Sequence, residues 1–160
     1  TFGPRQSARA VIPTIITQLA AHDPKQGSAR IRPGATAPTC GFTFVSDTVA
    51  GFIAAADSQG AIGEVVNIGT NFEISVGDTA QTIANLMGVE LIIETEDTRL
   101  RPDASEVERL WCDNRKAAEL IGWQPAHAGL TGFRRGLEAT IDWFAAPANR
   151  AGYKAHLYNV

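Results

Sequence analysis

Apolar side chains recur at intervals of three or four residues along three stretches of the chain, a spacing that gives a helix one apolar face. The stretches cover residues 8–21, 76–87 and 131–145. Pro13 lies inside the first of them, so this helix either starts at the proline or kinks there. On the last stretch the buried face is expected to carry Phe133, Leu137, Ile141 and Phe144.

Capping residues predict two more helices and define the ends of a third. Ser46 or Asp47 offers an N-cap oxygen for a helix that runs to about residue 56. Asp113 does the same for a short helix over residues 115–121, which Gly122 ends. Ser75, followed three residues later by an aspartate, resembles a capping box ahead of residues 76–87.

β-Branched and aromatic residues predict short strands between these helices. The expected strands cover residues 42–45, 64–68 and 89–93, with a further short strand around residues 30–32 and an apolar segment at 107–111. The fold class is therefore α/β. The pattern leaves the direction of the strands open.

Composition narrows the class of protein. The 160 residues are 44% apolar and 19% charged, which suits one globular domain over residues 1–160. A net charge of −3 gives no basic excess, so no nucleic-acid partner is expected. No apolar run is long enough for a membrane span and no signal-peptide pattern opens the sequence. With two cysteines and no disulfide framework, the expected location is cytoplasmic.

The residues that several kinds of catalytic or cofactor site need are absent from this sequence. Gly60 and Gly63 precede an expected strand, whereas a pyrophosphate-binding turn follows one. Tyr153 is followed four residues later by leucine, so there is no Tyr-x-x-x-Lys pair. Cys40 and Cys112 have no nearby base or metal-spaced partner and are expected to be buried, small apolar residues. His127 is expected in a loop.

Arginines outside the helix interiors are the strongest candidates for ligand binding. A guanidinium gives bidentate contacts to phosphate, so arginines brought together from separate loops would suit a diphosphate ligand. The alternative is a solvated surface. The candidates are Arg9, Arg30, Arg32, Arg99 and Arg101.

Four segments resemble, in order, the C-terminal half of extended short-chain dehydrogenases, the NAD-dependent epimerase/dehydratase family. Within it, the sequence is most similar to nucleotide-sugar 4,6-dehydratases of the GDP-N-acetylglucosamine type, from legionaminic acid synthesis. The segments are Phe2-Gly3-Pro4 with Ile12-Pro13, Thr39 to Asp47, Gly63-Glu64-Val65-Val66-Asn67-Ile68-Gly69, and Arg101-Pro102 with Asp113 to Pro125.

The resemblance implies a small substrate-binding lobe of the extended short-chain dehydrogenase fold, without the Rossmann dinucleotide-binding half. Arg101 would contact the nucleotide diphosphate, Glu106 the ribose, and Arg9 the nucleotide. Cys40 stands where the family has an arginine, which would weaken nucleotide binding. No cofactor or metal is expected in this chain, whereas the full-length family uses NAD.

Three functions stay open. The first is a truncated or separated nucleotide-sugar-binding lobe that is not catalytic alone, with a Rossmann half supplied in trans. The second is a homo-oligomeric protein-interaction module derived from that lobe. The third is a breakdown fragment of an intact NAD-dependent 4,6-dehydratase.

Overall fold

The computed structural model describes residues 1–23, 25, 27–33, 35–94 and 107–153. Its α-helices are α1 (Val11–Ala20), α2 (Val45–Asp57), α3 (Val76–Met87), α4 (Arg115–Ile121), α5 (Gly129–Ala145) and α6 (Pro147–Arg150), with a 3₁₀ turn η2 (Gln59–Ala61). Its strands are β1 (Ala29–Ile31), β2 (Thr39–Cys40), β3 (Ile74–Ser75), β4 (Leu91–Ile93) and β5 (Arg109–Leu110).

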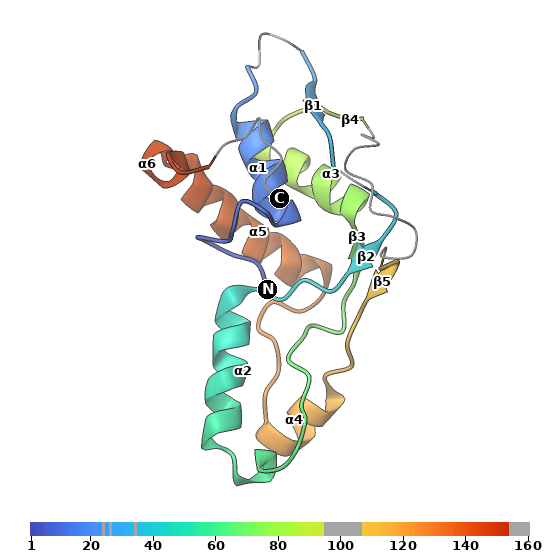
Figure 1. Ribbon diagram of the computed structural model, residues 1–160, viewed down its shortest axis with the longest axis vertical. Helices are drawn as coiled ribbons and strands as arrows, with labels where there is room; N and C mark the ends of the chain where they lie inside the picture. The colour runs from blue at the N-terminus through green and yellow to red at the C-terminus, as the bar shows by residue number, and fades with distance from the viewer. Residues whose placement is uncertain (24, 26, 34, 95–106, 154–160) are drawn as a thin grey trace.

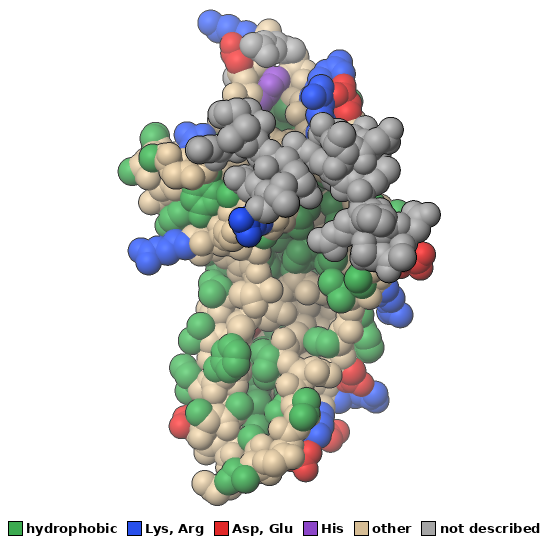
Figure 2. Space-filling view, viewed as in Figure 1, with side chains coloured by type: hydrophobic (Ala, Val, Ile, Leu, Met, Phe, Trp, Pro, Cys, Tyr) green, Lys and Arg blue, Asp and Glu red, His purple; other side chains and the backbone are tan. Residues whose placement is uncertain are grey.

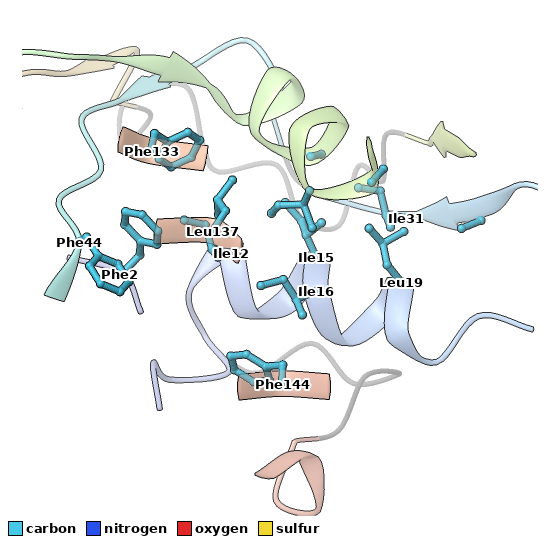
Figure 3. Close-up of a cluster of buried hydrophobic side chains, with 14 residues drawn as sticks. Phe2, Ile12, Ile15, Ile16, Leu19, Ile31, Phe44, Phe133, Leu137 and Phe144 are labelled. Atoms are coloured by element: carbon cyan, nitrogen blue, oxygen red, sulfur yellow. The ribbon is translucent and has the colours of Figure 1, made fainter. Parts of the chain in front are cut away.

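Three helices, α1, α3 and α5, pack against one another and form the main core (Figure 1). Apolar residues of α1 meet those of α3 and α5 in a cluster that also takes in one face of β1 (Figure 3). Burial of this apolar surface is the main stabilising contribution to the fold. The largest fully buried side chains include Ile12, Ile15, Ile16, Ile31, Ile83, Leu137 and Phe144.

Two small sheets flank the helices. In one, β1 and β4 are parallel, and Arg30 is the register partner of Ile92. In the other, β2 lies in the centre, antiparallel to β3 and parallel to β5. Both parallel pairs join segments far apart in the sequence, and of the helices between them α3 contacts β3 and β4.

Residues 45–70 and 111–128, here called the extension, project from the three-helix core and contain α2 and α4 (Figure 1). Trp123 fills the interior of the extension at 4% exposure, and its indole N–H donates to the Asp47 carbonyl. Gly51 brings α2 close to Ile68, because a Cβ there would lie 2.6 Å from the isoleucine side chain. The extension is therefore packed on one side only.

An aromatic cluster joins the extension to the core. Phe2 is 1% exposed and makes edge-on contacts with Phe42, Phe44 and Phe133 (Figure 3). Its backbone also pairs with the residues leading into α2, through Phe2 N to the Thr43 carbonyl at 2.9 Å. Gly136 on α5 admits these rings, since a Cβ there would lie 2.7 Å from Phe2 and 2.9 Å from Phe44.

The expected helices are confirmed, but two of the expected N-caps are wrong. The N-cap of α4 is Asn114, with no side-chain bond, and not Asp113. Pro13 lies in the first turn of α1. Backbone N–H groups in this turn have no acceptor within the helix, so the proline costs the helix no hydrogen bond. Ser75 caps α3 by accepting from Asp78 N, and Gly88 ends it in the left-handed conformation. Neither Ser46 nor Asp47 caps α2; its N-cap is Phe44, with no side-chain bond.

Two expected strands are wrong in position or pairing. Residues 42–45 contribute only an isolated bridge between Phe44 and Phe2, while the paired strand is the preceding β2. Residues 64–68 lie outside every strand among the described residues. The strands expected around residues 30–32 and at 89–93 are confirmed as β1 and β4.

Within the described ranges, no helix combines the length and apolarity needed to cross a bilayer.

Replacing Gly136 with alanine tests the aromatic cluster. The added methyl would overlap Phe2 and Phe44, so G136A should lower the free energy of unfolding by about 1–3 kcal/mol. Gly77→Ala in α3 is the matched control, because its Cβ meets atoms no closer than 3.5 Å and alanine favours the helix. Urea unfolding measures both; equal stability of G136A and wild type would contradict the packing described.

Candidate functional site

Arg9 is the sequence-predicted site residue whose position the structure describes. It is exposed just ahead of α1, and its backbone N–H bonds to Ser7 Oγ at 3.3 Å. Its side chain has no partner among the described residues, so its guanidinium is free to bind an anion. Arg101 and Glu106, like Arg99, lie outside the described residues, and their roles stay predictions.

Two of the candidate arginines converge on one carboxylate. Arg30 Nη1 bonds to Glu94 Oε1, and Arg32 Nε lies 3.3 Å from Glu94 Oε2. The hydrogen bond from Arg30, followed by that from Arg32, holds the pKa of Glu94 below its ordinary value. This cluster lies at the carboxyl ends of parallel strands β1 and β4, an edge where α/β sheets commonly bind ligands.

Cys40, which replaces the arginine expected from the family, occupies the central strand of the second sheet. It is half-buried and in register with Ile74 on one side and Leu110 on the other. On the same strand, Thr39 Oγ1 donates to Glu73, and Arg109 binds that carboxylate through two nitrogens. The hydrogen bond from Arg109, followed by that from Thr39, holds the pKa of Glu73 below its ordinary value.

Cys112 is half-buried in the extension, not fully buried as expected, and is a poor nucleophile. A Cβ on Gly69 would lie 2.1 Å from its sulfur, so the thiol packs directly against the glycine. Burial, and secondarily the negative charge of Asp113, raise the pKa of the Cys112 thiol. A raised pKa lowers the thiolate fraction at neutral pH, and the thiolate is the reactive form.

His127 has a structural partner that local sequence does not reveal. Its ring Nδ1 lies 3.0 Å from Asp47 Oδ1, and its backbone N–H donates to Asp47 Oδ2 at 2.8 Å. Asp47 is 3% exposed, and the imidazole also packs on Phe44. The pair fixes the loop after α4 to the first turn of α2.

Charged residues also line an open depression of about 640 Å³ on the extension. Four of its charged side chains form ion pairs, Lys116 Nζ with Glu64 at 2.7 Å and Arg115 with Asp113, and Glu119 also lines it. These ion pairs connect α4 to segments that precede it in the chain. The depression therefore offers a ligand less unpaired charge than the Arg9 region does.

The glycine turn at residues 60–63 differs from a pyrophosphate-binding turn. Gly60 lies in the 3₁₀ turn η2 and Gly63 follows it; among the described residues, α2 and not a strand precedes this turn, and an extended segment and not an α-helix follows it. A pyrophosphate cradle needs a strand before the turn and an α-helix after it. Within the described part of the chain, no three His, Cys, Asp or Glu side chains group as metal ligands.

Solved structures share this fold. An epimerase from Methanothermobacter thermautotrophicus is 29% identical with a TM-score of 0.74, over 95% of this chain and 43% of that one. A UDP-glucuronic acid 4-epimerase from Bacillus cereus, in complex with UDP-glucuronic acid and NAD, is 26% identical with a TM-score of 0.70, over 89% of this chain and 41% of that one. The fold is thus that of part of a nucleotide-sugar-modifying enzyme.

The family follows from the sequence match. The family model for GDP-mannose 4,6 dehydratase matches residues 1–137. The human dTDP-D-glucose 4,6-dehydratase is 29% identical over 157 residues, covering 89% of this chain and 39% of the relative. The chain belongs to this family of NAD-dependent nucleotide-sugar dehydratases and epimerases, and it spans about two fifths of the length of these relatives. The family resemblance is confirmed.

The raised pKa of Cys112 predicts slow alkylation. In a Cys40→Ser variant, which leaves one cysteine, iodoacetamide at pH 8 should modify Cys112 at least about fivefold more slowly in the folded protein than in urea, because both access and thiolate fraction are lower. Intact-mass spectrometry follows the reaction. Equal rates in the folded and unfolded states would show an accessible thiol with an ordinary pKa.

Proposed function

We propose that this chain is the nucleotide-sugar-binding lobe of an NAD-dependent nucleotide-sugar dehydratase or epimerase, and that it does not catalyse the reaction by itself. Family membership across residues 1–137 is the observation that carries the proposal. Arg9, exposed just ahead of α1, and the exposed Arg30 and Arg32, in and directly after β1, supply guanidiniums suited to a phosphorylated ligand.

The diphosphate would be bound chiefly by Arg101, with Arg9 contacting the nucleotide and Glu106 the ribose. These three assignments come from the family motif. The free guanidinium of Arg9 supports its part, because the described residues leave it without a competing carboxylate. Loss of the family arginine at Cys40 should cost the complex a charge-assisted hydrogen bond, worth roughly 1.5–3 kcal/mol.

NAD would be bound by residues outside the printed sequence, in the same protein or in a second one. The face that such a dinucleotide-binding half would cover is the outer side of the extension. Figure 2 shows apolar side chains spread over the lower part of the molecule, where Figure 1 places α2. The exposed large apolar residues of the extension include Phe52 and Ile53 on α2, and Ile62 and Val65 on the segment that follows it.

A second candidate function is a homo-oligomeric interaction module, and the same apolar face supports it. Phe52 is 70% exposed, Ile62 74% and Val65 82%. Large contiguous apolar patches on globular proteins commonly mark interaction sites. In this second proposal, another copy of the chain covers the apolar face of the extension, with or without a bound nucleotide.

Isothermal titration calorimetry with nucleotide sugars tests the first proposal. UDP-glucose, dTDP-glucose and GDP-mannose are titrated without NAD, and at least one should bind. Arg101→Gln should then weaken that binding roughly 10- to 150-fold, and Cys40→Arg should strengthen it by a similar factor, since each changes one charge-assisted contact. Arg115→Gln on α4 is the control and should change nothing. Absence of heat with all three sugars would contradict the proposal.

Light scattering at micromolar concentrations tests the interaction module. A dimer or larger assembly is expected if the α2 face pairs with a second copy. Phe52→Asp should dissociate it, because a buried unpaired carboxylate is unfavourable, whereas Leu130→Asp, at an exposed apolar residue on α5, should not. A wild-type monomer throughout the concentration range would exclude the homo-oligomer.

A further inference from the structure

Residues 146–153, here called the strap, contact the chain on both sides of α1. Arg150 Nη1 donates to the carbonyl of Ala20, the last residue of α1, at 3.1 Å. The hydroxyl of Tyr153 donates to the carbonyl of Gln6, ahead of that helix, at 2.8 Å. The tyrosine of the strap therefore bonds to the loop of residues 4–10, which carries Arg9.

The loop of residues 4–10 has few other contacts that fix it. The buried residues on either side are Phe2 and Ile12, whereas the loop itself is exposed or half-buried. Its own backbone bonds are local, since the N–H groups of residues 6 and 10 each donate to a carbonyl three residues earlier. Among the described residues, Tyr153 is the only one beyond α1 that hydrogen-bonds to this loop.

The backbone of Arg5, in the same loop, needs contacts that hold it. Its φ is 65°, in the left-handed region that residues other than glycine rarely adopt. Such a conformation persists where the surrounding structure fixes it, because by itself it is less stable than the ordinary one. The Tyr153 hydroxyl bonds to the carbonyl of the next residue, Gln6, so it stabilises this turn. Loss of that bond would allow the loop to relax and Arg9 to move with it.

The ring of Tyr153 is held in place independently of its hydroxyl. It lies edge-on to Phe144 with 4.8 Å between the ring centroids, and edge-on to Trp143 with 6.2 Å. Phe144 belongs to the buried core beside α1 (Figure 3). Burial raises the pKa of the Tyr153 hydroxyl, so this group stays protonated and able to donate at neutral pH. The strap thus presents a fixed donor to the loop.

We propose that Tyr153 is a positioning residue, which holds the loop of residues 4–10 so that the Arg9 guanidinium stays directed at the phosphorylated ligand. The inference rests on the proposed function and deepens it, because it names a residue that acts on the ligand through Arg9. The side chain of Arg9 suits such control, since no partner among the described residues fixes it. A loop that is already fixed loses less conformational freedom when the ligand binds.

Tyr153→Phe tests the proposal, because it removes the hydroxyl and keeps the ring contacts with Trp143 and Phe144. Calorimetry uses UDP-glucose, dTDP-glucose and GDP-mannose as probes. For each one that binds, Y153F should weaken binding about three- to tenfold, the loss expected for one neutral hydrogen bond. Thr82→Val is the control, since it removes a hydroxyl-to-carbonyl bond of 2.7 Å within α3 and should leave the affinity unchanged.

A double-mutant cycle with Arg9→Gln separates positioning of Arg9 from a general loss of structure. If Tyr153 acts through Arg9, Y153F should change the affinity less than about twofold in the R9Q background. Hydrogen exchange of the unliganded chain gives a second readout. The amides of residues 6 and 10 should exchange at least about threefold faster in Y153F, whereas those of α3 should keep their rates.

The opposite results overturn the proposal in distinguishable ways. If a nucleotide sugar binds and Y153F keeps the wild-type affinity and the wild-type exchange rates in the loop, Tyr153 does not hold the loop, while the proposed function stands. If the losses in Y153F and R9Q simply add, the tyrosine affects binding by a route other than Arg9. If none of the three nucleotide sugars binds the wild-type chain, the proposed function fails and this inference fails with it.

Discussion

The contact between Phe2, Phe44 and the bare backbone of Gly136 is the constraint on which the arrangement of the chain depends. It brings together the first residues, the connection from β2 into α2, and the middle of α5. Because no side chain at position 136 separates them, the aromatic rings pack directly on the helix. The extension is thereby anchored to a core whose other contacts come from α1, α3 and α5.

The two parts of the molecule differ in how completely their apolar surface is covered. In the core, α1, α3 and α5 bury their apolar faces against one another and against the sheets. In the extension, Trp123 and its bond to Asp47 close one side, while Phe52, Ile62 and Val65 face outward. This asymmetry supports the proposal that the chain works beside another protein unit.

Local interactions are the part of the structure that the sequence predicts well. The cap of α3 follows from Ser75 and Asp78, three residues apart, and the end of α3 from Gly88. The α2 cap is mispredicted because the Asp47 carboxylate is used by His127, 80 residues further along the chain. The segment 64–68 has strand-forming residues but no described strand beside it, and pairing needs a partner as well as propensity.

The candidate site is only partly predictable for the same reason. Arg30 and Arg32 could be named as ligand candidates, but their meeting at Glu94 depends on the parallel pairing of β1 with β4 across more than 60 residues. Sequence patterns do not reveal such pairing, and no periodicity links the segments. Arg101 and Glu106 were found through family motifs alone, and their roles stay predictions.

The central claim is that this chain holds the nucleotide sugar while the coenzyme is held elsewhere. Equilibrium dialysis of the purified chain against labelled UDP-glucose and labelled NAD, side by side, tests it directly. The account predicts that the sugar nucleotide is retained and that NAD equilibrates freely across the membrane. Retention of NAD by the chain alone, or free passage of the sugar nucleotide, would contradict it.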